Sequence, residues 1–152
     1  MHSVQTVAVL SLKGGVGKTT IVLGLASAAQ RRGARTLVVD LDPQCNATAT
    51  LDPEDTKATL AEVLETPRPA VLRDAIASSG WGEEVDVLVG SEELELLNDQ
   101  DPDPRRLEKL GRALEELQHL VDDGELPYKL VLLDCPPSLG RLTKSALMAA
   151  HG

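Results

Sequence analysis

One segment constrains this chain more than any other, the run KGGVGKTT at residues 13–20. It follows a short apolar, β-branched run at 6–11, and the stretch at 18–32 that comes next has apolar residues at helical spacing. Glycines let a backbone curl so that successive N–H groups face one anion, and a helix start adds the positive end of its dipole. The order strand, glycine loop, helix therefore predicts a site for a phosphate group.

This loop departs from the usual phosphate-loop pattern. Leu12 stands where the pattern has its first glycine, and Lys13 precedes Gly14. The alternative is a plain glycine turn, but both flanks match the pattern, so we favour the phosphate site. We expect Lys18 to reach the β- and γ-phosphates of a nucleotide and Thr19 to bind Mg²⁺. The predicted nucleotide contacts are Lys13, Gly14, Gly15, Val16, Gly17, Lys18, Thr19 and Thr20.

Strand patterns alternate with helix patterns along the rest of the chain. The strand patterns are almost continuously apolar, as in strands that are buried on both faces. The further predicted elements are strands at 35–42, 85–89 and 129–134 and helices at 59–64, 70–79, 92–97, 104–121 and from 139. This alternation predicts an α/β fold, a doubly wound and mostly parallel sheet, in one domain that comprises residues 1–152.

The core of this fold must be aliphatic, because aromatic residues make up 1% of the chain and Phe is absent. In the helix at 18–32, the spacing places Ile21, Leu25, Ala28 and Ala29 on one helical face. Such an apolar face is typical of a helix that packs against a core.

Two acids close the strand at 35–42. Asp40 and Asp42 end it, and Pro43 follows. Because ligands bind outside the carboxyl ends of parallel strands, we expect these carboxylates to order Mg²⁺-bound waters or an attacking water. The alternative is that they only form the turn before Pro43.

A third acid, Asp134, ends the strand at 129–134. An acid after an apolar strand is the pattern of a carboxylate that contacts Mg²⁺ through water. The segment at 136–140, PPSLG, follows. We leave open whether this segment pivots as a nucleotide-sensing switch or is an ordinary loop between a strand and a helix.

Charge and composition exclude several classes of protein. The formal net charge is −9, so the surface as a whole does not attract nucleic acid. Cys45 and Cys135 form no metal-ligand pattern, and a disulfide framework is not expected. The N-terminus lacks the charged region of a signal peptide, and no apolar run is long enough for a membrane span. We therefore expect a cytoplasmic protein.

Three segments together, KGGVGKTT, VVDLDPQCNAT and LVLLDCPPSLGRLTKSALMAA, resemble the ParA/MinD group of ATPases with a deviant phosphate loop. The ParA (Soj-type) partitioning proteins are the most similar, and VDVLVGSEELELL looks like their connector. At the fifth residue after Asp40 these proteins usually have Gly, where this chain has Cys45. Members of the group are much longer, so the chain is similar to their N-terminal part only.

The resemblance implies ATP and Mg²⁺ as cofactors and a Mg²⁺-dependent ATPase activity. Lys13 would be the signature lysine, which reaches the nucleotide of the partner subunit in an ATP-dependent homodimer. Lys18 would be the conventional phosphate lysine, Asp42 would position the attacking water, and Asp134 would lie behind the magnesium. A ParB-like protein would stimulate hydrolysis. Non-specific DNA would be bound only through a C-terminal half that residues 1–152 lack.

Other functions remain as alternatives. The chain could be a MinD-like or other regulatory ATPase, or a nucleotide-binding fragment without activity, although DLDPQ and DCPPSLG favour the ParA type. The best cluster of cations for DNA is Arg105, Arg106, Lys109 and Arg112. Because Glu108, Glu115 and Glu116 dilute its field, we favour a solvated helix face there.

Overall fold

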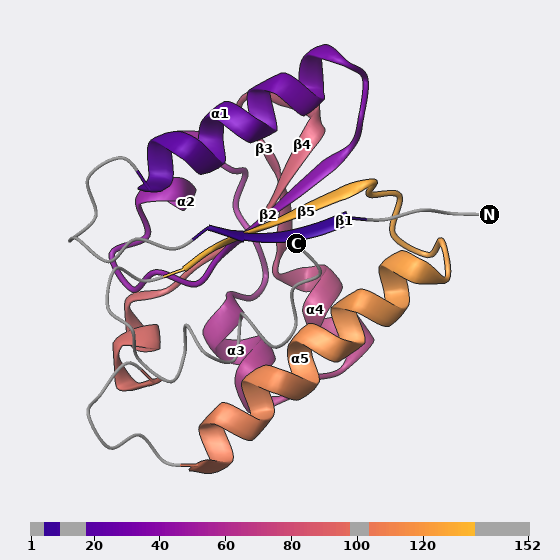
Figure 1. Ribbon diagram of the computed structural model, residues 1–152. Coiled ribbons are helices and arrows are strands. Elements are labelled where there is room, and N and C mark those ends of the chain that lie inside the picture. Colours follow the sequence, from indigo (N-terminus) through magenta and orange to yellow (C-terminus); the bar gives the residue numbers. More distant parts are fainter. Residues whose placement is uncertain (1–4, 10–17, 98–103, 136–152) are drawn as a thin grey trace.

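The computed structural model describes residues 5–9, 18–97 and 104–135, and its strands form one sheet (Figure 1). The strand order is β1-β5-β2-β4-β3. The strands are β1 Gln5–Val9, β2 Thr36–Asp40, β3 Ile76–Ser79, β4 Gly82–Leu88 and β5 Leu130–Asp134. Neighbours pair in parallel except β3, which is antiparallel to β4 at the edge. The predicted mostly parallel sheet is thereby confirmed.

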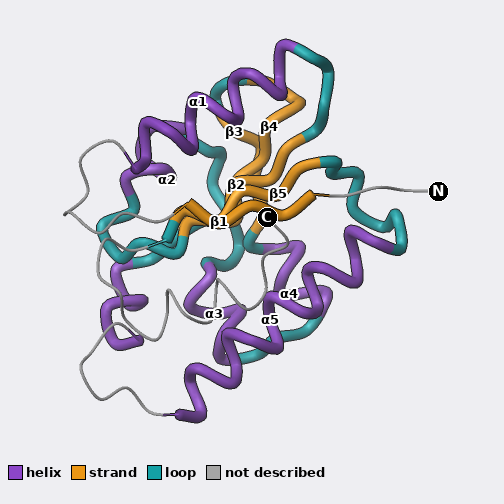
Figure 2. Tube along the Cα trace, in the orientation of Figure 1, coloured by secondary structure: helices purple, strands orange, loops and turns teal. Residues whose placement is uncertain are grey.

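Helices cover both faces of this sheet (Figures 1 and 2). The helices α1 and α2 lie on one face, and α3, α4 and α5 lie on the other. Their bounds are α1 Lys18–Arg31, α2 Asn46–Leu51, α3 Leu60–Glu65, α4 Pro69–Asp74, the 3₁₀ helix η1 Glu92–Leu97 and α5 Pro104–Asp122. The fold is therefore doubly wound, as the alternation of patterns predicted.

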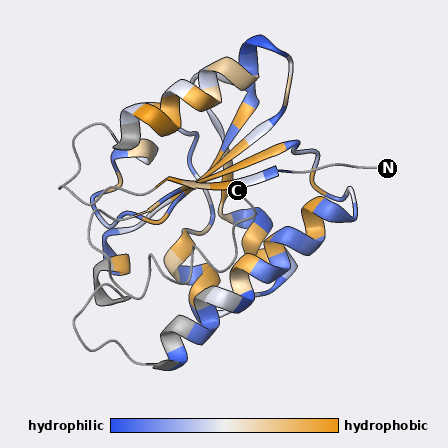
Figure 3. Cartoon of the chain, viewed as in Figure 1, coloured by the Kyte–Doolittle hydropathy of each residue, from blue (hydrophilic) through white to orange (hydrophobic). Residues whose placement is uncertain are grey.

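Alternate strand residues divide the core into two apolar layers. In β2, Leu37 and Val39 pack towards α3, α4 and α5, while Val38 packs towards α1 and α2. Figure 3 shows strands that are mainly apolar between helices with mixed polar and apolar surfaces. Because β2 is buried along its whole length, its carboxyl end is held at a fixed place in the sheet.

Helix α1 has the predicted extent but a different buried face. Val22, Ala26 and Ala29 are buried, whereas Ile21 is 56% exposed and Leu25 is 41% exposed. Of the predicted face through Ile21, Leu25, Ala28 and Ala29, only Ala29 is buried, so most of the predicted face does not pack on the sheet. Apolar and small residues occur around most of this helix, so spacing alone does not select one face.

The predicted helix at 70–79 is wrong in its second half. Helix α4 ends at Asp74, and β3 then pairs antiparallel with β4 through the turn at Gly80 and Trp81. The Gly80 N–H donates to the Leu51 carbonyl oxygen at 2.7 Å, which holds this turn near the end of α2. Pairing with a neighbouring strand overrides the weak local preference of Ile76–Ser79.

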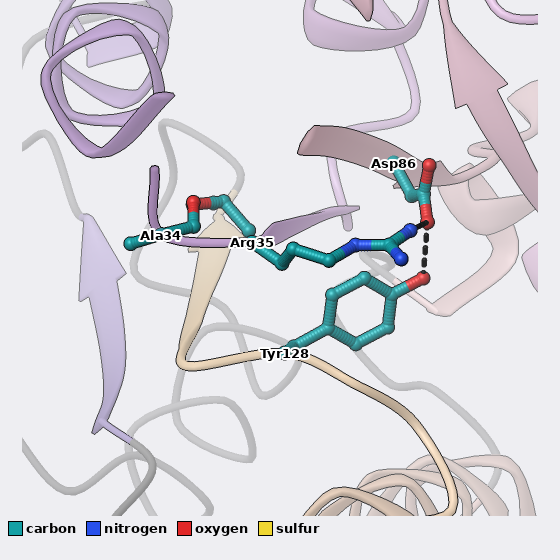
Figure 4. Close-up of polar contacts among 5 residues, drawn as sticks. Ala34, Arg35, Asp86 and Tyr128 are labelled. Atoms are coloured by element: carbon teal, nitrogen blue, oxygen red, sulfur yellow. Dashed lines mark hydrogen bonds and ion pairs between the residues drawn. The ribbon is translucent and has the colours of Figure 1, made fainter. Parts of the chain in front are cut away.

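Arg35, Asp86 and Tyr128 form a polar cluster (Figure 4). It lies towards the amino-terminal end of β2, because Asp86 is in register with Leu37 of that strand. The Tyr128 hydroxyl donates to Asp86 Oδ2 at 2.6 Å, and the Arg35 guanidinium lies 3.3 Å from the same oxygen. The guanidinium carbon is also 6.0 Å from the centre of the Tyr128 ring. Burial, together with the bond to Asp86, raises the pKa of Tyr128 well above its usual value. The cluster joins the segments before β2 and β5 to β4.

Candidate functional site

The carboxyl ends of three adjacent strands form one row. Val9 of β1 is in register with Asp134 of β5, and Asp134 is in register with Asp40 of β2. The Cys135 N–H donates to the Val9 carbonyl oxygen at 3.3 Å, and the Leu41 N–H donates to the Asp134 carbonyl oxygen at 3.0 Å. The backbone that enters the predicted phosphate loop therefore lies beside Asp134.

Much of the predicted loop lies outside the residues that the structure describes, and so does the segment at 136–140. These loop residues are Lys13, Gly14, Gly15, Val16 and Gly17. Helix α1 begins at Lys18, so Lys18, Thr19 and Thr20 form its first turn. A helix N-terminus has N–H groups without intrahelical partners, and these suit an anion.

Asp40 is fully buried, and backbone and hydroxyl groups surround its carboxylate. Oδ1 accepts from the Asp42 N–H at 3.2 Å. Oδ2 accepts from the Thr48 N–H at 2.9 Å and from the Thr48 hydroxyl at 2.6 Å. Burial raises the pKa of Asp40 to about 6; the bonds from Thr48 oppose the rise and the charge of Asp134 adds to it. These contacts support the alternative that Asp40 forms the turn.

Asp42 is 2% exposed and lies just beyond the end of β2. Its Oδ1 accepts from the Gln44 N–H at 3.0 Å, and its carbonyl oxygen accepts from the Cys45 N–H at 2.9 Å. A carboxylate that accepts from the N–H two residues on is a common turn contact. Asp42 thus helps to form the turn and also lies at the edge where a ligand of a parallel sheet binds.

A family model described as "AAA domain" matches residues 4–152. The chain belongs to this AAA-domain family. The resemblance to the ParA and Soj partitioning ATPases, inferred above from three motifs, is confirmed by relatives that bear these names.

Three of the similar proteins illustrate the match. The chromosome partitioning protein ParA of Caulobacter vibrioides (strain NA1000 / CB15N) is 36% identical over 154 residues, which cover 98% of this chain and 54% of the relative. The chromosome-partitioning ATPase Soj of Thermus thermophilus is 37% identical over 151 residues, which cover 98% and 53%. The chain spans about half the length of the curated relatives it matches.

The third is a solved structure of cobyrinic acid a,c-diamide synthase from Mycobacterium smegmatis with a bound ATP analogue and magnesium. It is 35% identical, with a TM-score of 0.73, and the match covers 97% of this chain and 57% of that one. Over the matched part, that structure has a fold similar to the one described here.

Cys45, where ParA proteins usually have Gly, has a left-handed backbone with φ 57°. Glycine adopts this conformation without steric cost, which explains the preference at this position. Cys45 is the N-cap of α2 but makes no side-chain cap hydrogen bond. Burial, followed by the charges of Asp40, Asp42 and Glu92, raises the pKa of the Cys45 thiol to about 11. The thiol therefore stays protonated and is a poor nucleophile or metal ligand.

Two residues of this AAA-domain site were missed by the sequence analysis, Thr48 and Gly90. The Thr48 hydroxyl donates to Asp40, and it accepts from the Gly90 N–H at 3.1 Å. The only signals for them are a threonine in the segment DPQCNAT and a glycine directly after an apolar strand. Neither signal identifies a partner, because the two residues meet only in the folded sheet.

In ranges 5–9, 18–97 and 104–135, no group of three or more His, Cys, Asp or Glu side chains could hold a metal ion. Mg²⁺ keeps several waters and binds through one or two protein oxygens plus substrate phosphates.

In the same ranges, no helix combines the length and apolar character needed to cross a bilayer.

Proposed function

We propose that this chain carries the Mg²⁺–ATP site of a ParA-type partitioning ATPase that acts in the cytoplasm. The observation that carries the proposal is the row of strand ends, where Asp134 and Asp40 lie in register beside the backbone that enters KGGVGKTT. The names of the relatives support ATP hydrolysis and chromosome partitioning. The ATP analogue and magnesium in the Mycobacterium smegmatis structure support the ligand.

The donor set fits this ligand. Lys18 and the first turn of α1 would hold the β- and γ-phosphates, with the N–H groups of residues 13–17 around them. Thr19 would bind Mg²⁺ through its hydroxyl, and Asp134 would contact it through water. The bound ion would neutralise charge on the phosphates. Asp42 would order the attacking water, because it follows the strand end next to Asp134 and its carboxylate is held by Gln44.

The assembly of the protein is a further part of this proposal. Lys13 would reach the nucleotide of a second copy in an ATP-dependent homodimer, and a ParB-like protein would stimulate hydrolysis. DNA binding would belong to a C-terminal half like the one that the relatives carry. In α5, Lys109 pairs with Glu65 at 3.4 Å and Arg112 pairs with Glu108 at 2.9 Å. These ion pairs support the solvated helix face and weak DNA binding by this helix.

The substitution Lys18→Ala tests the site. We expect it to abolish Mg²⁺-ATP binding in calorimetry, because the phosphates lose their main positive charge. Lys57→Ala removes one exposed lysine from a loop and serves as the matched control. Unchanged affinity in a folded Lys18→Ala protein would show that KGGVGKTT is not the nucleotide site.

A further inference from the structure

The carboxylate of Asp40 bonds directly to two segments at the edge of the proposed site and is linked to a third through Thr48. These are the turn at Asp42, the start of α2 at Thr48 and the residue Gly90 after β4. We propose that Asp40 and Thr48 are positioning residues for hydrolysis and act through Asp42. This inference rests on the proposed ATPase function. It replaces the water-ordering role expected of Asp40 with a positioning role and adds Thr48.

The hydrogen bonds of Asp40 indicate that it acts through its neighbours. Both of its oxygens accept hydrogen bonds from groups of this chain, at 3.2 Å from Asp42 and at 2.9 and 2.6 Å from Thr48. The residue is fully buried. An acid that orders water at the phosphate must reach the ligand, whereas these bonds direct the Asp40 carboxylate into the fold.

The same carboxylate caps helix α2 from a distance. Cys45, the N-cap residue, provides no side-chain cap, and Asp40 accepts from the Thr48 N–H of the first turn instead. A negative charge at a helix N-terminus is favourable, and a bonded N–H there is one that the helix itself leaves without a partner. The position of α2 is therefore coupled to the end of β2.

Thr48 extends the link to the next strand. A hydroxyl can donate one hydrogen bond and accept others, and this one donates to Asp40 and accepts from the Gly90 N–H. On the opposite side of β2, the Leu41 N–H donates to the Asp134 carbonyl oxygen. The chain just before Asp42 is thus held from both neighbouring strands.

Gly90 allows this approach because it has no side chain. A Cβ atom there would lie 3.0 Å from the carbonyl oxygen of Asp40 and 3.1 Å from its Cγ. Contacts this short with backbone oblige one segment to move. The φ of Gly90 is not in the left-handed region, so the lack of space is the reason for glycine.

These links converge on Asp42. Its N–H is bonded to Asp40, and its own Oδ1 is bonded to the Gln44 N–H within the same turn. A shift of Asp40 therefore moves the peptide that carries the Asp42 side chain. Catalytic groups act only from a narrow range of positions, so such a shift lowers turnover more than it weakens binding.

The test removes the Thr48 hydroxyl and keeps the shape of the side chain. We expect Thr48→Val to lower kcat about 10- to 100-fold, because small misplacements of a catalytic group have effects of this size. Mg²⁺-ATP affinity in calorimetry should stay close to that of the wild type. Thr48→Ser restores the hydroxyl and should restore kcat. Thr50→Val removes an exposed hydroxyl from the same helix and is the matched control.

A second arm separates positioning from general damage. In an Asp42→Asn background, Thr48→Val should cause little further loss of turnover, because its effect passes through Asp42. If the double variant instead shows the product of the two single-variant losses of turnover, Thr48 does not act through Asp42. If Thr48→Val unfolds, as judged by the fluorescence of the single Trp81, Gly90→Ala replaces it and should give the same loss of kcat.

The two proposals fail in different ways. If the wild-type protein binds ATP tightly but does not hydrolyse it, both the ATPase function and the positioning role are overturned. Normal wild-type turnover together with unchanged kcat in Thr48→Val overturns only the role of Asp40 and Thr48.

Discussion

Asp40 and Asp86 are buried acids on adjacent strands, but they lie towards opposite ends of β2. Amide and hydroxyl groups of Asp42 and Thr48 bond to Asp40, whereas Asp86 is paired with the cation of Arg35 and with Tyr128. A carboxylate beside a cation is compensated within the protein. At the carboxyl end of β2, backbone and hydroxyl donors hold Asp40 and link the strand end to α2. The cluster around Asp86 instead joins β4 to the segments before β2 and β5.

The largest effect is expected for Asp42, at the acidic end. Asp42→Ala should leave ATP binding largely intact and lower turnover about 10²–10⁴-fold, as for groups that act on a proton or water in the transition state. Steady-state hydrolysis assays and calorimetry measure the two effects. Asp55→Ala, at an exposed loop acid, is the control. Turnover near that of the wild type would show that a group other than Asp42 orders the attacking water.

The opposite pattern is expected at Asp86. Asp86→Ala leaves the partly buried Arg35 and the Tyr128 hydroxyl without their acceptor, and it should lower the free energy of unfolding by about 1–3 kcal/mol. Hydrolysis per folded molecule should not change, because Asp86 lies towards the amino-terminal end of β2, opposite Leu37, whereas Asp40 and Asp134 lie at the carboxyl ends of their strands. Chemical denaturation followed by Trp81 fluorescence measures the loss. A variant of normal stability with impaired turnover would show that the two ends are coupled.

The titration of Tyr128 sharpens the same contrast. It is the only tyrosine of the chain, and its pKa lies above the ordinary value of 10.0 in the folded protein. The folded state therefore holds its proton more tightly than the unfolded state, so this contribution to stability is complete below pH 10 and is lost as the pH rises further. Tyrosinate absorbance should increase only together with unfolding. A reversible titration near pH 10 in folded protein contradicts the buried bond to Asp86.

The smallest effect is expected at Cys45. Cys45→Gly removes the steric cost of the left-handed backbone at this position, but it also raises the conformational entropy of the unfolded chain. The net gain in the free energy of unfolding should be roughly 0.5–1 kcal/mol. Thermal unfolding measures it, and Cys45→Ser, which keeps a Cβ at this position, should show no gain. A less stable glycine variant would mean that packing of the thiol outweighs the backbone strain.

Local patterns predicted most of this fold. The apolar runs identified β2 and β5, the spacing of leucines identified α5, and the acids were placed correctly at the strand ends. The strand β3 was missed because Ile76–Ser79 depends on pairing with β4 rather than on its own residues. The buried face of α1 was missed because both of its sides are apolar.

The site was predictable only in part, for the same reason. A motif identifies residues that are close in sequence, such as Asp40 and Asp42. It does not identify Thr48 as the partner of Asp40 or Gly90 as the partner of Thr48, because these contacts form only when α2 and the end of β4 meet β2. The roles of Lys13, Lys18 and Thr19 remain predictions from the motif.

The position of β5 between β1 and β2 has a consequence for how the chain folds. In the described part of the chain, β1 pairs only with β5. The other described strands and helices all lie between these two strands in the sequence. Such distant pairings form slowly, because closing a long loop costs conformational entropy before the strand contacts that compensate for it have formed. On the ribosome, β1 would leave the exit tunnel long before its partner is synthesised. The row of strand ends therefore assembles late, and the proposed nucleotide site would form only after β5 has inserted.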